Sequence, residues 1–283
     1  MNVFDVNVHF HQVMENDLHS ATQTEDAARS LKTESTMDVS DYIECIERNA
    51  DEWRKTCQSA NFMFFNHSLF EGTTLSSVVQ RIQAQFPGSA CTALMNVEKP
   101  ARLEVLRNLK SIGFCAIKFH PYSQKIESQH LDCILEICGH AQTLGMPIFI
   151  CTSFGTAKMH DHDGIGLACK IADRISGVPI VLLHAGAIRC FEAFLLAEDR
   201  LNVFLETSFS LDYLEGSRYI DDFMFIFKRL GSERILYGSD SPFVRMDSAK
   251  EALERRLRGY GFSGAELQNI FHDNAARMFA RKD

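Results

Sequence analysis

The sequence predicts a single-domain (β/α)8 barrel, an α/β fold. Three observations support this prediction: strands alternate with helices, there are eight such units, and the chain has the length of one barrel domain. Short apolar runs alternate with amphipathic helical segments along most of the 283 residues. Strands that alternate with helices pair in parallel through right-handed crossovers. Eight such units close into a barrel, and barrels of this length commonly form one domain. The alternative is an open doubly wound sheet, which normally carries a glycine-rich loop after its first strand, whereas residues 9–12 here read His-Phe-His-Gln.

The first strand is predicted over residues 3–11, Val-Phe-Asp-Val-Asn-Val-His-Phe-His. Because side chains alternate between the two faces of a strand, its even-numbered residues would form an apolar face and its odd-numbered residues a polar face. The polar face would then carry Asp5, Asn7, His9 and His11. Two imidazoles on one side of a strand end can hold one zinc or related ion. A lone His-x-His is equally compatible with two solvated histidines.

The next segment, residues 12–40, is predicted to be a long insertion after the first strand. It is rich in Ser, Thr, Asn, Asp and Glu and has little apolar periodicity. An insertion of this length in a compact domain is usually a lid or binding loop, or else disordered. The sequence leaves both alternatives open.

The rest of the chain alternates regularly between strands and helices, with Pro and Gly at several boundaries. Strands are expected over residues 60–65, 91–97, 114–119, 147–152, 178–183, 202–207 and 234–237. Helices are expected over residues 41–60, 74–86, 100–109, 129–144, 166–175, 188–197, 219–230, 248–258 and 264–280.

The composition indicates a globular protein that acts on small molecules. Hydrophobic residues make up 46% and charged residues 23%, and no apolar run is long enough to span a bilayer. The start of the chain lacks the features of a signal peptide, and nine scattered cysteines suit a reducing compartment, so we expect a cytoplasmic protein. A net charge of -8 without a basic stripe argues against nucleic acid as a partner. The sequence leaves the oligomeric state open, with a homodimer as one alternative.

Residues that commonly carry chemistry stand at four of the predicted strand ends. In a barrel of this kind the active site lies at the C-terminal ends of the strands. Taken singly, each residue has an ordinary explanation, such as a turn-forming Asp or a buried His that is satisfied by the backbone. Their coincidence at four ends predicts one site. The candidates are His9 and His11 on the first strand, Lys118 and His120 on the fourth, His184 on the sixth and Asp240 on the eighth.

Several of these stretches resemble the amidohydrolase superfamily, in particular the amidohydrolase-related group that includes lactonases and non-oxidative decarboxylases. The resemblance covers nearly the whole chain, and the Gly-Ser-Asp-x-Pro stretch is its most specific part. It implies a barrel hydrolase or lyase with one divalent metal ion, usually zinc, and it makes His9, His11, His184 and Asp240 the expected ligands. The stretches are residues 4–9 (FDVNVH), 117–121 (IKFHP), 183–186 (LHAG), 237–242 (YGSDSP) and 274–279 (NAARMF).

Two positions depart from the pattern of that group. Aligning its Asp-x-His-x-His opening on Asp5 places Asn7 and His9 in the ligand positions and leaves His11 outside them. The fifth strand ends in Cys151 where the group has histidine. A thiolate can bind zinc, whereas an amide is a poor ligand for it. Further candidate ligands are therefore Asn7 and Cys151, together with His160 and His162 from the loop after the fifth strand, which is otherwise a solvated loop.

The resemblance suggests a mechanism. A metal-bound water would attack a small carbonyl compound such as a lactone, amide or cyclic ester. Asp240 would act as general base and then general acid, and His184 would bind the metal or stabilise the oxyanion. Lys118, His120 and Arg245 are candidates for holding the substrate. Two alternatives remain: a non-oxidative decarboxylase on the same scaffold, and a barrel that has lost its metal and binds a ligand without turnover.

Overall fold

Eight parallel strands form the centre of the molecule, in the spatial order β1 to β8, which is also their order along the chain. The structure, a computed structural model, describes residues 1–10, 34–70, 73–98 and 103–280. A parallel bridge between Val8 and Ser241, with a 2.8 Å hydrogen bond from the His9 backbone N–H to the Ser241 carbonyl, joins the first strand to the chain just after the last strand. The predicted barrel is therefore confirmed, and the open sheet is excluded.

All eight predicted strands are present, and most are shorter than predicted at one or both ends. The first strand, for example, ends at His9. The strands are β1 Phe4–His9, β2 Ser59–Phe64, β3 Ala90–Leu94, β4 Ala116–Phe119, β5 Ile148–Cys151, β6 Ile180–Leu183, β7 Val203–Glu206 and β8 Ile235–Leu236.

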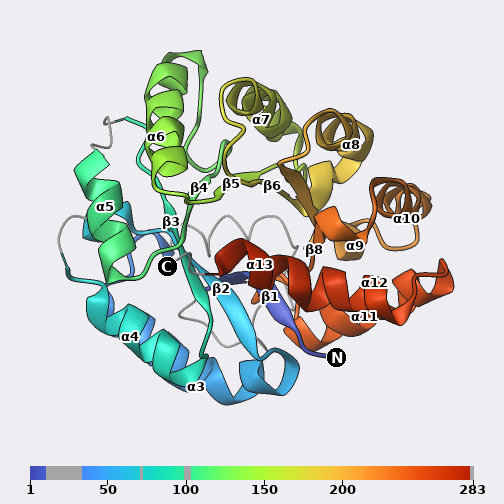
Figure 1. Cartoon of the computed structure of the whole chain (residues 1–283), viewed down its shortest axis with the longest axis horizontal. Helices are drawn as coiled ribbons and strands as arrows, with labels where there is room; N and C mark the ends of the chain where they lie inside the picture. The colour runs from blue at the N-terminus through green and yellow to red at the C-terminus, as the bar shows by residue number, and fades with distance from the viewer. Residues whose placement is uncertain (11–33, 71–72, 99–102, 281–283) are drawn as a thin grey trace.

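The helices surround the strands, as Figure 1 shows. Helix α10 has its predicted bounds, whereas the predicted helix 264–280 is divided by a π-helical turn at Asn269–Asp273. The helices are α3 Val39–Thr56, α4 Ser76–Gln85, α5 Leu103–Ile112, α6 Leu131–Thr143, α7 Gly164–Ala172, α8 Cys190–Asp199, α9 Ser210–Tyr213, α10 Tyr219–Leu230, α11 Met246–Gly259, α12 Gly264–Gln268 and α13 Asn274–Phe279. Short 3-10 turns lie at His67–Leu69, Ser128–His130, Ala157–Asp161, His184–Arg189 and Ser232–Arg234.

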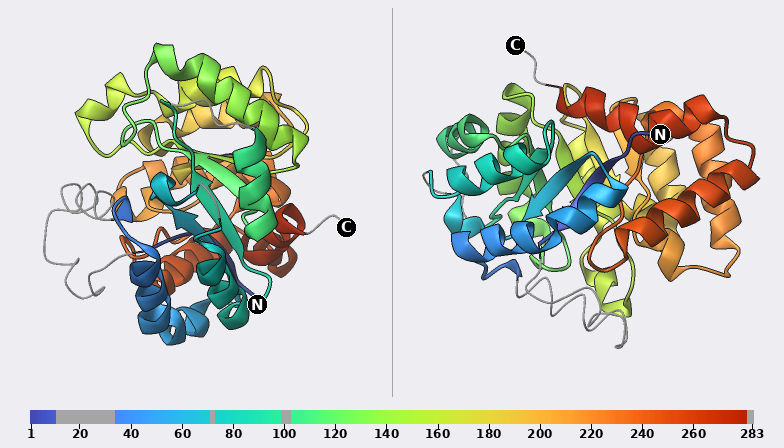
Figure 2. Two further views of the ribbon diagram at one scale, coloured as in Figure 1. Left: turned by 90° about the vertical axis from the view of Figure 1, so that its left-hand side faces the viewer. Right: turned by 90° about the horizontal axis from the view of Figure 1, so that it is seen from below.

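The N-terminal end of the barrel is closed by helix α13. Figure 2 shows α13 on the same side of the molecule as the start of the chain. The Phe279 ring stacks on Phe4 with 5.5 Å between ring centroids and on Phe149 with 6.1 Å. Phe4 and Phe149 belong to the apolar cluster inside the barrel. This end of the barrel is therefore filled by a packed apolar core, and the functional site is expected at the opposite end.

Strand β1 contains a β-bulge, which changes the faces that simple alternation predicts. The three-residue step from Asp5 to Val8 runs alongside only two residues of β2, so one residue of β1 is extra. Phe4 and Val6 consequently pack inside the barrel, whereas Val8 and Phe10 pack outside it against the helices. The prediction of one continuous apolar face was wrong, because the extra residue reverses the alternation.

The predicted insertion at residues 12–40 falls mostly outside the described residues. Its last part is described: Glu34 is buried, and Asp38 caps α3 by accepting hydrogen bonds from the backbone N–H groups of Ser40 and Asp41. None of the described helices is long and apolar enough to cross a lipid bilayer.

Candidate active site

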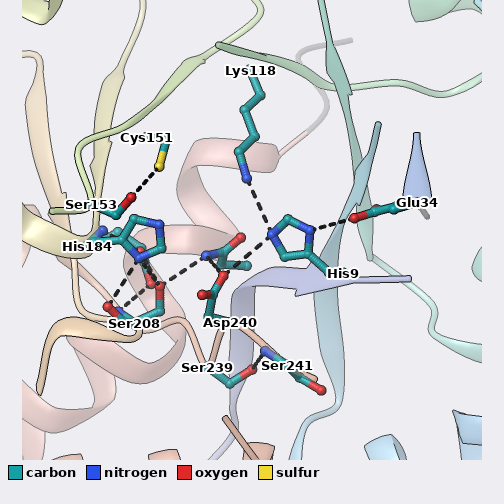
Figure 3. Close-up of polar contacts among 12 residues, drawn as sticks. His9, Glu34, Lys118, Cys151, Ser153, His184, Ser208, Ser239, Asp240 and Ser241 are labelled. Atoms are coloured by element: carbon teal, nitrogen blue, oxygen red, sulfur yellow. Dashed lines mark hydrogen bonds and ion pairs between the residues drawn. The ribbon is translucent and has the colours of Figure 1, made fainter. Parts of the chain in front are cut away.

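Buried polar side chains from six strands meet at the C-terminal end of the barrel, as Figure 3 shows. This arrangement agrees with the prediction that polar strand ends converge. The side chains are Asn7 and His9 from β1, Lys118 from β4, Cys151 from β5, His184 after β6, Glu206 and Ser208 at the end of β7, and Asp240 after β8.

Asp240 lies at the centre of this mouth. Its Oδ1 accepts a 2.8 Å hydrogen bond from Nδ2 of Asn7 and lies 3.5 Å from Nε2 of His9. Its backbone has φ of +63°, a conformation that costs energy for a residue other than glycine and is common at functional sites. Burial raises the pKa of the carboxyl group, and the positive charges of His184 and Lys118 oppose that rise. A base of raised pKa is better matched to proton transfer near neutral pH.

His9 is held from both sides of its ring. Its Nδ1 pairs with Oε2 of Glu34 at 2.9 Å, and the rings of Phe65 and Phe243 lie against the imidazole. A carboxylate at one ring nitrogen fixes the orientation of the other. Nε2 of His9 is therefore directed toward Asp240 and the mouth.

Lys118 is almost fully buried, with 2% of its surface exposed, and does not extend to solvent. Its Nζ lies 3.4 Å from Nε2 of His9 and 4.8 Å from the centre of the Phe65 ring. Burial lowers the pKa of this amine, whereas negative charge on Cys151, Asp240 and Glu34 favours the ammonium form. The lysine thus places a positive charge inside the mouth.

His184 takes part in a hydrogen-bonded series that runs to β7. Its Nδ1 lies 3.1 Å from Oγ of Ser208, and that hydroxyl donates to Oε2 of Glu206 at 2.8 Å. The backbone N–H of His184 also donates to Oε2 of Glu206, at 3.0 Å. Burial alone would lower the pKa of His184, but negative charge on Cys151 and Asp240 raises it to about 9.

Cys151 ends β5 beside two histidines. Its Sγ lies 3.1 Å from Oγ of Ser153, and the imidazoles of His120 and His184 favour ionisation of its thiol. Burial opposes ionisation of a thiol, but the two imidazoles outweigh burial here and hold the pKa of Cys151 well below its usual range. Gly164 packs against the Cys151 carbonyl, where a Cβ would collide with it.

Buried Asp5 gives a first testable prediction, which concerns stability. Its Oδ2 has no hydrogen-bond partner among the described residues, and burial raises its pKa from 3.8 to about 7. Between these two pH values the folded chain keeps a proton that the unfolded chain has released. We therefore expect Asp5 to lower the free energy of unfolding by about 1.4 kcal/mol per pH unit as pH rises through this window.

The measurement is denaturant unfolding of the wild type and of Asp5→Asn from pH 5 to 8. The neutral amide has no proton to release, so the variant should lose less stability as pH rises. Equal slopes for the two proteins would contradict the assignment of a neutral Asp5.

Comparison with known proteins identifies the family. A family model described as Amidohydrolase matches residues 70–281. The chain belongs to the amidohydrolase family. No curated protein matches this amidohydrolase.

Three solved structures resemble this amidohydrolase in fold. An uncharacterised TIM-barrel protein from Bordetella bronchiseptica shares 14% identity with a TM-score of 0.65, and 99% of each chain is covered. A 2,6-dihydroxybenzoate decarboxylase shares 15% identity with a TM-score of 0.63, also over 99% of each chain. A putative 2-pyrone-4,6-dicarboxylic acid hydrolase from Pseudomonas putida shares 15% identity with a TM-score of 0.60, over 98% of this chain and 97% of that one. At such identities the likeness establishes the barrel fold alone.

Members of the family usually bind a divalent metal ion, and the described donor set of this amidohydrolase does not fit one. Within residues 1–10, 34–70, 73–98 and 103–280, no three His, Cys, Asp or Glu side chains are grouped so that they could hold an ion. Asn7 directs its NH2 group at Asp240, and the Lys118 nitrogen lies against Nε2 of His9. An ammonium group there would repel a divalent cation. The expected ligands His9, His184 and Asp240 instead belong to hydrogen-bonded pairs.

Four other candidate residues make contacts with residues outside the set above or lie outside the described residues. His160 is exposed and packs on the Phe154 ring, and His162 lies 3.2 Å from the Ile126 carbonyl. Arg245 donates to Asp247, so its charge is already compensated. His11 is outside the described residues.

Glu34, Glu206 and Ser208 are site residues that the sequence did not single out. Glu34 lies in the polar segment 12–40, where nothing distinguishes one acidic residue from its neighbours. Glu206 and Ser208 do stand at a strand end, in Leu-Glu-Thr-Ser, and that position was the available signal. The glycine at position 238 is a second signal, which the structure explains: a Cβ at this position would collide with the Glu206 carboxylate.

Proposed function

We propose that this amidohydrolase hydrolyses a small carbonyl compound, such as a lactone, amide or cyclic ester, with Asp240 as general base and general acid. One observation carries the proposal. Asp240 is buried in the mouth with Oδ1 fixed by Asn7 and His9, while its Oδ2 has no hydrogen bond to a described residue. An oriented carboxylate with one oxygen left over can take a proton from water.

The reaction balances as follows. The Asp240 carboxylate takes a proton from the water whose oxygen attacks the carbonyl carbon, and the carbonyl electron pair moves to its oxygen. When this pair returns, the bond from carbon to the leaving oxygen or nitrogen breaks, and Asp240 returns the proton to the leaving group. The products are a carboxylic acid and an alcohol or amine.

The positive groups around Asp240 suit the charge that develops on the carbonyl oxygen. Lys118 and His184 both lower the pKa of Asp240 through their charge, and Nζ of Lys118 lies 3.4 Å from the His9 nitrogen that is itself 3.5 Å from Oδ1 of Asp240. Fixed cations in a buried site stabilise an oxyanion more strongly than water does. Lys118 and His120 would also suit a carboxylate on the substrate.

The testing experiment measures acid release from small lactones, amides and cyclic esters by the purified full chain, with 2-pyrone-4,6-dicarboxylic acid among the probes. Hydrolysis of at least one class is expected. Release of CO2 from 2,6-dihydroxybenzoate or a similar acid without hydrolysis would favour the decarboxylase alternative, which the same scaffold in a structural neighbour supports. Saturable binding with neither product would favour the barrel without turnover, which Asn7 and Cys151 motivate.

A further prediction concerns the metal. Zinc bound by His9, His11, His184 and Asp240 is what the family resemblance implies, but Lys118 and Asn7 occupy the space beside His9 and Asp240. We expect elemental analysis of the purified protein to find well under one equivalent of zinc or manganese per chain. Turnover should survive dialysis against a chelator. Stoichiometric metal whose removal abolishes turnover would overturn this prediction and restore the metal-dependent mechanism.

The homodimer and the cytoplasmic location stay predictions from the sequence.

A further inference from the structure

We propose that the outer face of helices α8 and α10 is the surface through which two copies of this chain associate as a homodimer. This face, which we call the α8–α10 patch, consists of four large apolar side chains that are exposed to solvent: Ile188, Phe191, Leu195 and Phe225. The association is independent of the reaction that we propose for the barrel mouth.

Exposed apolar side chains are distributed unevenly over this barrel. Among the described residues eight large hydrophobic side chains are exposed, and five of them lie on α8, next to its ends or on α10. The five are the members of the patch and Leu201. Helices α3, α4, α5, α6, α7 and α11 expose no such side chain within the described ranges. Single exposed apolar residues are ordinary on a protein surface, whereas a contiguous group usually marks an interaction site.

The patch is continuous across the two helices. Figure 1 shows α8 and α10 next to each other on the outside of the barrel. The rings of Phe191 and Phe225 form a pair between the helices, with 6.4 Å between their centroids. Leu195 follows Phe191 by one helical turn, so it lies on the same side of α8. Ile188 lies three residues before Phe191, just ahead of the start of α8.

The size of the patch suits the centre of a protein–protein interface. The exposed fractions are 38% for Ile188, 45% for Phe191, 61% for Leu195 and 57% for Phe225. For side chains of this size, these fractions leave about 400 Å² in contact with water. A standard interface buries about 800 Å² of each partner, with an apolar centre and a polar rim. The patch would therefore supply about half of one subunit's contribution, and the charged residues around it would supply the rest.

The charges at the two ends of the patch favour a second copy of this chain as the partner. At one end Nε of Arg189 donates to Oε1 of Glu192 at 2.9 Å, and at the other end Nε of Arg229 lies 3.6 Å from Oε1 of Glu198. Each end thus carries one guanidinium and one carboxylate. A copy related by a two-fold axis can meet each of these charges with its opposite. A nucleic acid or an anionic membrane would need an excess of positive charge, which these two pairs do not provide.

The first experiment is sedimentation velocity of the purified full chain from about 1 to 100 µM. We expect the mass of two chains at the upper end of this range. Phe225→Glu and Leu195→Glu each introduce a charge into the apolar centre, so each should weaken association about tenfold or more. Both side chains are exposed, so the unfolding temperature should stay close to that of the wild type.

Gln80→Glu is the matched control. It adds the same charge to an exposed position of α4, on the opposite side of the barrel in Figure 1, and should leave the dimer intact. A wild-type chain that stays monomeric at about 100 µM would overturn the proposal. A dimer that survives in both patch variants would also overturn it, because the contact would then lie elsewhere.

The second experiment locates the contact without any substitution. Hydrogen–deuterium exchange of the wild type is measured at both ends of the same concentration range. Peptides that cover α8 and α10 should exchange more slowly in the concentrated sample, because association suppresses local opening of the helices that it covers. Peptides that cover α4 should exchange equally in both samples. Concentration-dependent protection of another face of the barrel, with α8 and α10 unchanged, would show that the chains associate through a different surface and that the proposal is wrong.

Discussion

Asp240→Asn is expected to lower kcat/KM by about 10²–10⁴-fold, the usual contribution of a general acid–base. The amide keeps the shape of the carboxyl group and can still meet Nδ2 of Asn7 through its oxygen, so the fold should persist. It cannot accept a proton at neutral pH.

The measurement is steady-state hydrolysis of the best probe from pH 5 to 9, with thermal unfolding as the check on folding. The wild type should lose activity in acid as Asp240 takes up a proton, at a higher pH than an ordinary aspartate because burial raises its pKa. The variant should lack this acid limb. Asp173→Asn is the matched control, because Asp173 is an exposed partner of Arg200 far from the mouth. Full activity in Asp240→Asn would remove Asp240 from the mechanism.

The barrel was predictable because its signals are local. Helix α10 is correct to the residue: Asp221 and Asp222 lie in its first turn, Lys228 and Arg229 in its last, and Gly231 follows with φ of +91°. These are the charges and the terminating residue that a helix of this length favours. No long-range information was needed for this element.

The bulge in β1 and the π turn in the last helical region could not be predicted in this way. Asp5 accepts hydrogen bonds from the N–H groups of Asn7 and Ser239, and these bonds connect β1 to the chain after β8. The bulge therefore depends on a partner more than 200 residues away along the chain. Neither periodicity nor composition near Asp5 contains that information.

The location of the candidate site was predictable from the sequence, whereas the contacts among its side chains were less so. Strand ends place His9, Lys118, His184 and Asp240 in one mouth, because all strands of a barrel point the same way. Which atom bonds to which depends on distances of a few ångströms. The expected metal position is an example, since the lysine that the sequence indicated as a substrate group lies against Nε2 of His9 instead.

Replacement of Lys118 is the second change that we expect to lower kcat/KM strongly. Lys118→Met keeps an unbranched side chain against Phe65 and removes the charge. We expect kcat/KM to fall by about 10²–10³-fold, the usual loss when a group that stabilises an oxyanion is removed. Lys250→Met is the matched control, because Lys250 pairs with Glu254 on the outer helix α11.

The pH profile separates a role in the reaction from a role in folding. The charge of Lys118 lowers the pKa values of both Asp240 and Glu34. Without it both pKa values should rise, so the acid limb of the activity profile should move to higher pH in Lys118→Met. A lysine that only supports the fold would lower the unfolding temperature and leave the limb in place. Loss of rate with an unmoved limb would therefore contradict the proposed electrostatic role, because the same charge that stabilises an oxyanion must also act on the carboxylate beside it.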